Sequence, residues 1–419
     1  MQIQPASFAF TVLLGSLAAV PYSSIDINLP ALAATGATLG ASPSAVGVTM
    51  SAFMLSLAVA PLLYGPVSDR FGRKPVIVFG IALFMVASLG CAVARSLPEL
   101  MACRFVQGVG AAGTATTFAI IRDLFDETTA RARIAAVMVV INVATVIAPT
   151  AGAALLTLGG WRLIYVIQAG IGTLLLSAVL LGFAESARIE PANRLAPTTV
   201  VQSYARVLTH PVSIAYILVG AAAGATVFGY VTGSSLFFIG VVGLRPEQYG
   251  LIFSACSAAV MTGALLDGRL GRRGIPAALV LTLGLALTTA AAAALLAMML
   301  AGWTPPAIVA ALLMTVALAF GMTMPNIMNA TMQPLPDIAG AVGATAGSIQ
   351  MTAGAASSGL VAVLFDGRSA LSMATVMAAC SLFSLTAYCL LARPAERRVL
   401  DRNPIPATSG RSRHTRLST

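Results

Sequence analysis

The chain has 419 residues, of which 58% are hydrophobic and 9% are charged, and its net charge is +10. Soluble domains carry about 25% charged residues, so this composition excludes an ordinary soluble protein. Long apolar runs recur from end to end, which indicates a protein that crosses a membrane many times. In such a protein, basic cytoplasmic loops explain the positive charge better than nucleic acid does.

Twelve apolar segments are each close to the roughly 20 residues that cross about 30 Å of hydrocarbon as a helix. In chain order, we expect transmembrane helices near residues 8–30, 45–67, 76–94, 98–120, 134–157, 161–183, 212–240, 247–267, 275–301, 306–331, 338–365 and 369–391. The five cysteines all fall within these segments without metal-ligand spacing, so we expect them to be packing residues.

The basic residues gather in every second connection and in the C-terminal tail. These segments hold 19 of the 24 Lys and Arg residues, and the exceptions are Arg95, Arg104, Arg162, Arg245 and Arg368. By the positive-inside rule, this asymmetry places both termini in the cytoplasm.

The longest polar connection divides the twelve helices into six and six. We expect a six-helix bundle over 1–183, a cytoplasmic linker over 184–211, a second bundle over 212–392 and a disordered basic cytoplasmic tail over 393–419. A repeat supports this division, because Gly65 and Asp69 recur as Gly263 and Asp267 at one constant offset. Two related six-helix halves are typical of secondary transporters.

The connection after the second expected helix reads Gly-Pro-Val-Ser-Asp-Arg-Phe-Gly-Arg-Lys over residues 65–74. It resembles the G-x-x-x-D-R-x-G-R-R/K loop of the major facilitator superfamily, and the resemblance extends over the chain from about 8 to 392. It implies an all-α membrane protein, with twelve transmembrane helices in two pseudo-symmetric six-helix bundles. It also implies a cytoplasmic latch that favours an outward-open state, formed by Gly65, Asp69, Arg70, Gly72, Arg73, Lys74 and Asp123.

The two latch glycines are expected to permit tight turns and close backbone approach. The alternative is that the charges of this loop only obey the positive-inside rule, although that rule requires no aspartate.

Two further motifs resemble those of proton-coupled members of this superfamily. Leu100–Gly108 resembles the fourth-helix motif that places an arginine, here Arg104, inside the membrane. Residues 148–153 resemble the antiporter motif Gly-Pro-x-x-Gly-Gly; the matching positions are Ala148, Pro149 and Gly152, and alanine replaces two of the glycines. The resemblance therefore implies proton-coupled antiport.

The end of the first expected helix reads Ser-Ile-Asp-Ile-Asn-Leu-Pro over residues 24–30. It resembles the first-helix signature of the bicyclomycin- and chloramphenicol-resistance branch, which is usually D-M-Y-L-P. Asn28 stands where that branch usually has tyrosine, so we expect a departure in substrate preference at this position.

Asp26 and Arg104 are the charges that we expect to carry proton coupling. Counted at 1.5 Å per residue along antiparallel helices, both lie at a comparable depth in the membrane. Charges within lipid are costly and generally face a cavity or a partner, so we expect both side chains to face a central cavity. Pro30 cannot donate a hydrogen bond to the Asp26 carbonyl, which weakens the helix there.

Each of these charges has a less specific interpretation. Asp26 could lie at the outer interface in water if the first helix ended by Tyr22, and Arg104 could extend to the outer headgroups. Substrate contacts are harder to predict, because polar residues in membrane helices as often join helices to one another. Our candidates for substrate binding are Asn28, Gln107, Asn142, Phe228, Tyr230 and Asn326.

The predicted function is proton-coupled efflux of a small drug-like or metabolite substrate by alternating access. The chain has no phosphate-binding Gly-Lys-Ser/Thr loop and no nucleophile elbow, so we expect neither an enzyme nor a cofactor or metal. The expected partners are the substrate, protons and lipid, without nucleic acid, for a monomer in the bacterial inner membrane. Uptake on the same fold is the alternative, and a membrane sensor or scaffold would normally carry a larger soluble domain.

Overall fold

The computed structural model describes residues 4–5, 7–182, 185 and 197–402, and within them every regular element is a helix. The first half contains α1 (Phe8–Asp26), η1 (Leu29–Ala31), α2 (Leu32–Leu39), α3 (Pro43–Phe71), α4 (Arg73–Val93), α5 (Leu97–Ala112), η2 (Gly113–Thr116), α6 (Thr117–Leu124) and α7 (Glu127–Gly182). The linker contains α8 (Pro197–Thr209).

The second half is built in the same way. It contains α9 (Pro211–Ser235), η4 (Leu236–Val241), α10 (Pro246–Arg272), α11 (Ala277–Leu300), α12 (Pro306–Met332), η5 (Pro336–Ile338), α13 (Ala339–Val363), α14 (Leu371–Ala387), η6 (Tyr388–Ala392) and α15 (Arg393–Arg402). The elements η4 and η6 are short π-helical segments that continue the preceding helix.

Nine segments of the described residues are long and apolar enough to cross a membrane. One of them, Thr128–Gly182, contains two crossings, because Gly159 and Gly160 interrupt α7 with non-helical backbone angles. The continuous run from α5 through α6 and the small-residue helix α13 supply two more. The prediction of an all-α protein with twelve membrane helices is therefore confirmed.

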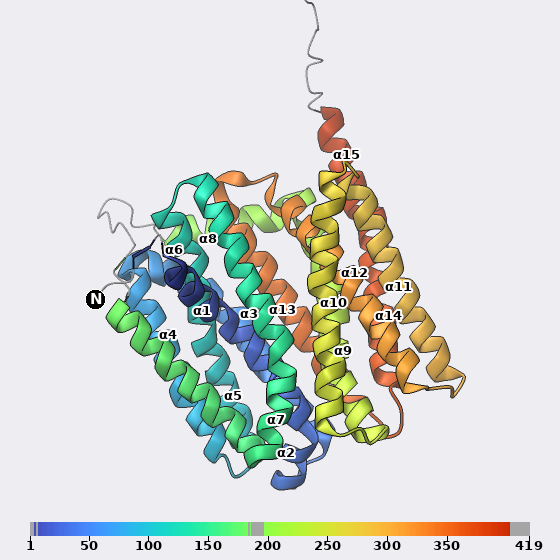
Figure 1. Cartoon of the computed structure of the whole chain (residues 1–419). Coiled ribbons are helices and arrows are strands. Elements are labelled where there is room, and N and C mark those ends of the chain that lie inside the picture. The colour runs from blue at the N-terminus through green and yellow to red at the C-terminus, as the bar shows by residue number, and fades with distance from the viewer. Residues whose placement is uncertain (1–3, 6, 183–184, 186–196, 403–419) are drawn as a thin grey trace, which may run out of the picture.

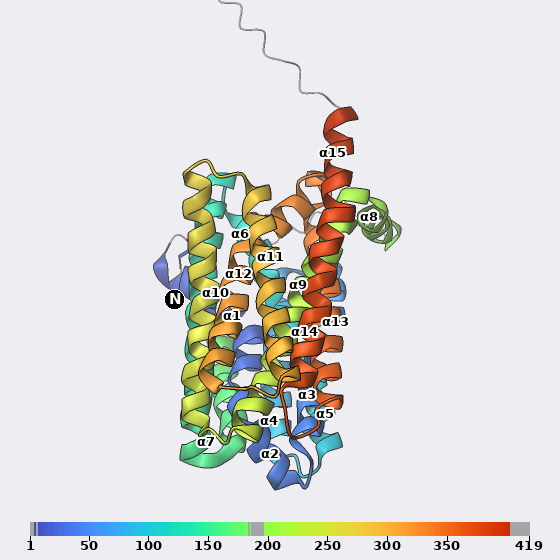
Figure 2. The ribbon, with the colours of Figure 1, turned by 90° about the vertical axis from the view of Figure 1, so that its right-hand side faces the viewer.

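The helices pack as two bundles, which Figure 1 shows side by side. One contains α1 and α3–α7, and the other contains α9–α14; they meet where α3 packs against α13 and α7 packs against α10. In Figures 1 and 2, α2 lies at the lower end of the molecule and α8 and α15 at the upper end. We call the α2 end outer and the α8 end inner, as the basic residues predict.

Contacts between the bundles gather in the outer half. Three hydrogen bonds that join the bundles lie there: Ser235 Oγ donates to the Leu29 carbonyl at 2.6 Å, and Thr150 Oγ1 lies 2.7 Å from Ser254 Oγ and 3.5 Å from the Gly250 carbonyl. Small residues allow this approach, since a Cβ on Gly47 would lie 3.1 Å from that of Ala362. The outer half of the interface is therefore closed.

The predicted domain limits remain predictions, although two segments within them are now described. Helix α8 belongs to the expected linker, of which residues 184 and 186–196 lie outside the described part. The first ten residues of the tail differ from the expected disorder, because they form α15, where Glu396 accepts a hydrogen bond from the Tyr216 hydroxyl of α9 at 2.9 Å. Residues 403–419 lie outside the described residues.

Candidate functional site

A cavity of about 120 Å³ lies between the two bundles, lined by α1, α7, α9 and α10. Its polar side chains are Tyr22, Asp26, Asn142, Thr145, Tyr230 and Ser257. Phe228 and Phe253 add aromatic surface, and the Tyr230 and Phe253 ring centroids are 6.0 Å apart. An aromatic cavity with a few convergent polar groups is the usual form of a small-molecule site.

Among the described residues that line this cavity, Asp26 is the only charged one. Its side chain is half-buried, and no hydrogen bond or ion pair joins its carboxylate to another side chain in the described chain. Helix α1 does not end by Tyr22: the apolar helical segment continues through Asp26 to Leu39. The premise of the interfacial interpretation of Asp26, a first helix that ends by Tyr22, is therefore wrong.

The helix breaks directly after Asp26, as Pro30 predicts. The Asn28 N–H bonds to the Ile25 carbonyl at 3.3 Å rather than to that of Ser24, and η1 follows. The Asn28 side chain then donates from Nδ2 to the Ser24 carbonyl at 2.9 Å. Asn28 is buried and absent from the cavity lining, so its predicted substrate contact is not found; it completes the hydrogen bonding of the broken helix instead.

The antiporter-motif segment packs against this break. Gly152 of α7 comes so close to α1 that an added Cβ would lie 2.0 Å from the Ile27 carbonyl oxygen. The next residue, Ala153, lies against α10, where a Cβ on Gly250 would be 3.2 Å from the Ala153 Cβ. The segment that begins with Ala148 and Pro149 thus packs tightly against Ile27 of the α1 break on one side and against Gly250 of α10 on the other.

Arg104 is fully buried and lies inside the first bundle. Its Nη1 donates to Gln107 Oε1 at 2.7 Å, its Nη2 lies 3.3 Å from the Met50 sulfur, and its guanidinium carbon is 4.3 Å from the centroid of the Phe53 ring. Gln107 Nε2 in turn donates to Ser88 Oγ and Gln168 Oε1, both at 2.7 Å. These side chains join α3, α4, α5 and α7.

The prediction that Arg104 and Asp26 face one cavity is wrong in this structure. Arg104 and Gln107 do not line the cavity, and the described residues contain no ion pair between Arg104 and Asp26. The physical reason is that Gln107, Met50 and Phe53 accept the guanidinium within the bundle. The alternative of an Arg104 side chain in the outer headgroups is also wrong, because the side chain is 0% exposed.

Of the substrate candidates, the structure brings three into the cavity: Asn142, Phe228 and Tyr230. Asn326 lies elsewhere, because its Nδ2 donates to Asp267 Oδ1 at 2.7 Å on the inner part of the second bundle. Sequence reasoning missed Tyr22, Thr145, Phe253 and Ser257. Their signal was helical spacing, since Tyr22 precedes Asp26 by one turn and Thr145 follows Asn142 by nearly one turn.

The inner ends of α3, α4 and α6 meet at an ion-pair cluster. Arg73 Nη1 lies 2.5 Å from Asp69 Oδ1, and its Nε lies 2.9 Å from Asp123 Oδ2. Arg73 also donates to Ser68 Oγ at 2.6 Å. Gly72 has a φ of 98°, a positive value that favours glycine. The prediction that Gly72 permits a tight turn is therefore confirmed.

Three other predicted latch residues have surroundings that differ from those of the Arg73 cluster. Gly65 is inside α3 with no atom within 4 Å of an added Cβ, so its expected turn and close approach are not found. The Arg70 guanidinium lies over the Phe71 ring at 5.4 Å. Lys74 Nζ donates to the Leu180 carbonyl at 3.2 Å.

Glu185 joins the start of α4 beside this cluster, and sequence reasoning missed it. Its two carboxylate oxygens accept the backbone N–H groups of Arg73 and Lys74 at 2.9 and 3.1 Å. These are the first N–H groups of α4, where a negative charge is favourable. A second cap lies near the start of α7, where hydrogen bonds from Thr128 and Thr129 hold the pKa of Asp126 well below its usual range.

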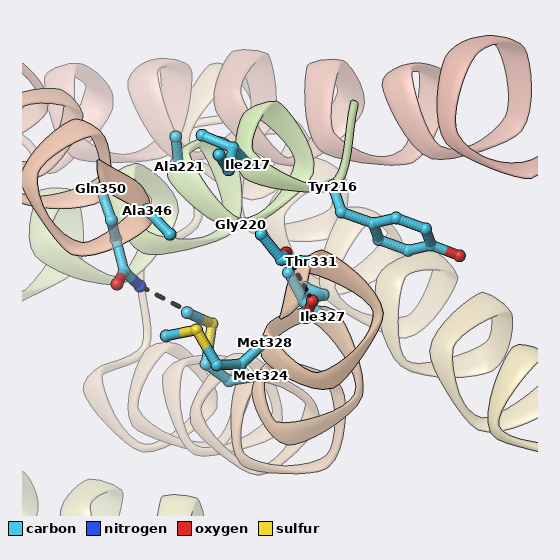
Figure 3. A pocket seen from close by; sticks show the side chains of 10 residues that line it. All are labelled: Tyr216, Ile217, Gly220, Ala221, Met324, Ile327, Met328, Thr331, Ala346 and Gln350. Carbon is cyan, nitrogen blue, oxygen red and sulfur yellow. Dashed lines mark hydrogen bonds between the residues drawn. The ribbon is translucent and has the colours of Figure 1, made fainter. Parts of the chain in front are cut away.

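A second hollow lies within the second bundle, between α9, α12 and α13 (Figure 3). The Gln350 amide points toward the Met324 sulfur, 3.7 Å away. The Tyr216 ring points away from both of these side chains. The volume of about 10 Å³ is room for no more than one water. Among the described residues, no group of three or more His, Cys, Asp or Glu side chains could hold a metal.

The family model of the Major Facilitator Superfamily matches residues 12–362. A bicyclomycin resistance protein homolog from Haemophilus influenzae is 26% identical over 393 residues, covering 93% of this chain and 98% of that protein. Multidrug resistance protein D from Escherichia coli is 31% identical over 344 residues, covering 80% and 83%. The predicted resemblance to the bicyclomycin-resistance branch is therefore confirmed.

Solved structures show the same fold. A bacterial homolog of the human lysosomal transporter Spinster, in an inward-facing and unoccupied conformation, has a TM-score of 0.74 at 16% identity and covers 96% of this chain and 100% of its own. A D-xylose–proton symporter has a TM-score of 0.70 at 16% identity, covering 90% and 97%. This chain belongs to the major facilitator superfamily, and it is a multi-pass membrane transporter rather than an enzyme.

Proposed function

We propose that this chain exports a small drug-like or metabolite substrate in exchange for protons, with Asp26 as the proton carrier. The observation that carries the proposal is the cavity between the bundles, where Asp26 lies among aromatic and hydroxyl side chains and is the one charged group of the described lining. The printed names of the relatives, which refer to bicyclomycin and multidrug resistance, support export of a drug-like molecule.

The exchange follows from competition for one carboxylate. A carboxylate in a partly desolvated cavity needs either a proton or another positive partner. When the cavity opens to the inner side, Asp26 gives its proton to the cytoplasm and the substrate takes its place. When it opens to the outer side, a proton displaces the substrate, so inward proton flow drives export.

The cavity suits an aromatic or cationic substrate. Phe228, Tyr230 and Phe253 offer ring faces, which attract a cation as well as another ring. Asn142 and Ser257 supply hydrogen-bond donors and acceptors on opposite bundles. We propose that these five side chains hold the substrate while Asp26 is deprotonated.

The inner ion-pair cluster is the proposed conformational latch. Arg73 joins α3, α4 and α6 through Asp69, Asp123 and Ser68, and Glu185 ties the start of α4 to the segment after α7. This arrangement makes the inner end of the first bundle one rigid body. It can therefore dock as a unit when the inner side closes.

We further propose that the protein acts as a monomer in the bacterial inner membrane, with both termini in the cytoplasm and without nucleic acid. The charge distribution supports this orientation, and the bacterial relatives support the membrane. One chain contains both bundles and the whole cavity between them.

Proton-coupled uptake on the same fold is the second candidate. Ala148 and Ala153 stand in place of two glycines of the antiporter motif, and this observation favours it. The two functions differ in the sign of proton exchange. Addition of substrate to the purified protein in weak buffer acidifies the solution for an antiporter and makes it more alkaline for a symporter.

That measurement tests the proposal with a panel of phenicols, bicyclomycin, sulfonamides and cationic dyes. We expect acidification with at least one of these compounds, and no acidification with Asp26→Asn. The matched control is Asp366→Asn, which changes an exposed carboxylate in the α13–α14 connection. Alkalinisation would establish symport, and acidification that survives in Asp26→Asn would remove Asp26 from proton exchange.

A further inference from the structure

The broken end of α1 leaves a series of backbone carbonyls without their helical donors. In a membrane protein each of these groups needs another partner, because no bulk water lies around it. The Ser24 carbonyl is bound by the Asn28 side chain, and the Asn28 carbonyl by the Ala31 N–H at 3.1 Å. These two partners belong to the same segment as the carbonyls that they bind.

The Leu29 carbonyl is different, because in addition to the Leu32 N–H of its own segment it accepts a hydrogen bond from the other bundle. Ser235 Oγ, on the last residue of α9, donates to it at 2.6 Å. Leu29 is 0% exposed and Ser235 is 2% exposed, so water does not compete for this bond. Of the three hydrogen bonds described between the bundles, it is the one made to the α1 break.

The position of this bond links two parts of the site. Leu29 is three residues after Asp26, on the segment that Gly152 contacts from the other side. On the second bundle, Ser235 leads directly into the aromatic segment of η4, where the Phe237 and Phe238 ring centroids are 5.2 Å apart. One hydroxyl therefore joins the Leu29 peptide, three residues after Asp26, to the packed outer part of the second bundle.

We propose that Ser235 is a positioning residue that fixes the broken end of α1 against the second bundle and so keeps Asp26 closed from the outer side. The hydrogen bond forms when the outer halves of the bundles meet and is lost when they separate. Closure of the outer half therefore also closes Asp26, the proposed proton carrier, from the outer side. This inference rests on the proposed function, because it gives Asp26 the role of proton carrier.

The neighbouring Ser234 provides a matched control. It is on the same turn and is 2% exposed, but its hydroxyl lies 3.0 Å from the Tyr249 hydroxyl and 3.3 Å from the Val231 carbonyl. Both partners belong to the second bundle. Removal of Ser234 Oγ therefore perturbs the packing of that bundle without breaking a bond between bundles.

The test compares Ser235→Ala with Ser234→Ala in the full-length transporter, in nanodiscs and without substrate or a proton gradient. Spin labels on cysteines at the exposed outer positions Arg95 and Arg368 report the separation of the bundles, after replacement of the five native cysteines. We expect Ser235→Ala to raise the ratio of outer-open to outer-closed molecules roughly five- to tenfold, the effect of one buried hydrogen bond. Ser234→Ala should change this ratio less than about twofold.

Ser235→Cys, with a weaker donor of nearly the same size, should give a shift between those of the wild type and Ser235→Ala. It also supplies the measurement if Ser235→Ala does not fold. Equal shifts for the Ser234 and Ser235 variants, or no shift for either Ser235 variant, would overturn the inference. These distances are measured without substrate or a proton gradient, so they do not depend on proton exchange. If Asp26 proved not to be the proton carrier, the measured effect of Ser235 on the outer opening would still stand.

Discussion

The two bundles share one helical plan but place their polar groups differently. The first bundle holds Asp26 in the cavity, Arg104 and its amide partners in the interior, and the Arg73 ion pairs at the inner end. In the second bundle the interior bonds are neutral, such as that between Thr232 Oγ1 and Ser358 Oγ at 2.6 Å. Under the proposed function, this difference assigns proton exchange to the first bundle, and gives the second bundle the role of supplying shape, ring faces and hydroxyl groups.

The inner ends show the same contrast at equivalent positions of the repeat. Asp69 in α3 pairs with the cation Arg73, whereas Asp267 in α10 accepts a hydrogen bond from the neutral amide of Asn326. A repeated carboxylate therefore has a charged partner in one half and an uncharged partner in the other.

The largest effect is expected where the first bundle packs most tightly around the α1 break. Gly152→Val would place side-chain atoms where the Ile27 carbonyl now lies and displace the segment that carries Asp26. We expect transport to fall on the order of tenfold or more, measured as substrate accumulation in vesicles. Gly170→Val, on the same helix with no atom within 4 Å of an added Cβ, is the control and should retain transport. Equal losses in both variants would show that α7 tolerates no larger residue anywhere.

The buried polar groups of the two bundles can be compared by stability. Arg104→Met leaves the Gln107 carbonyl oxygen without a donor in the interior, and we expect a cost of about 1–3 kcal/mol in unfolding free energy. Thr232→Val in the second bundle breaks one neutral hydroxyl pair and should cost about 1 kcal/mol or less. Denaturant unfolding in detergent measures both. A larger cost for Thr232→Val would contradict the contrast between the bundles.

The inner ends are expected to differ by a smaller factor. Arg73→Ala removes two ion pairs that are partly exposed, so we expect a change of roughly two- to tenfold in the ratio of inner-open to inner-closed molecules. Asn326→Ala removes one hydrogen bond from an uncharged amide to the Asp267 carboxylate within the second bundle, and it should change this ratio less than about threefold. Distance measurements between labelled inner ends test both variants. A larger effect of Asn326→Ala would assign the greater influence on inner opening to the second bundle instead of to the Arg73 cluster.

The smallest effect is expected where the linker contacts the first bundle. Pro66 has no N–H to give to the Leu62 carbonyl, and the Tyr204 hydroxyl of α8 donates to that carbonyl at 3.4 Å. Tyr204→Phe should change the inner-end distances about twofold or less, because the bond is long. In a Pro66→Ala background the helix supplies the donor itself, so Tyr204→Phe should then have no effect. A persistent effect would assign the role of Tyr204 to packing.

The twelve helices and the family could be predicted because they depend on local properties. Apolar runs of membrane length, Pro30 after Asp26 and the 65–74 loop pattern are read directly from neighbouring residues. The left-handed glycine at position 72 follows from the same local pattern. Asp26 belongs to this class as well, since a single carboxylate inside an apolar helix requires a special environment wherever the other helices lie.

The partners of the polar side chains could not be predicted, because they depend on how helices rotate against each other. Depth alone placed Arg104 level with Asp26, yet its side chain turns into its own bundle toward Gln107. The same limit explains Asn326, which binds Asp267 rather than facing the cavity. Ser235 gave no signal in the sequence, since one serine among many small residues of α9 acquires its role only from the carbonyl opposite.

The central claim is that proton exchange in this transporter passes through Asp26, and accumulation in proteoliposomes under an imposed pH gradient tests it most directly. With the identified substrate, wild-type protein should accumulate it against its gradient when the pH difference is present. Asp26→Asn should retain exchange of substrate across the membrane and lose gradient-driven accumulation. Undiminished gradient-driven accumulation by Asp26→Asn would contradict the account.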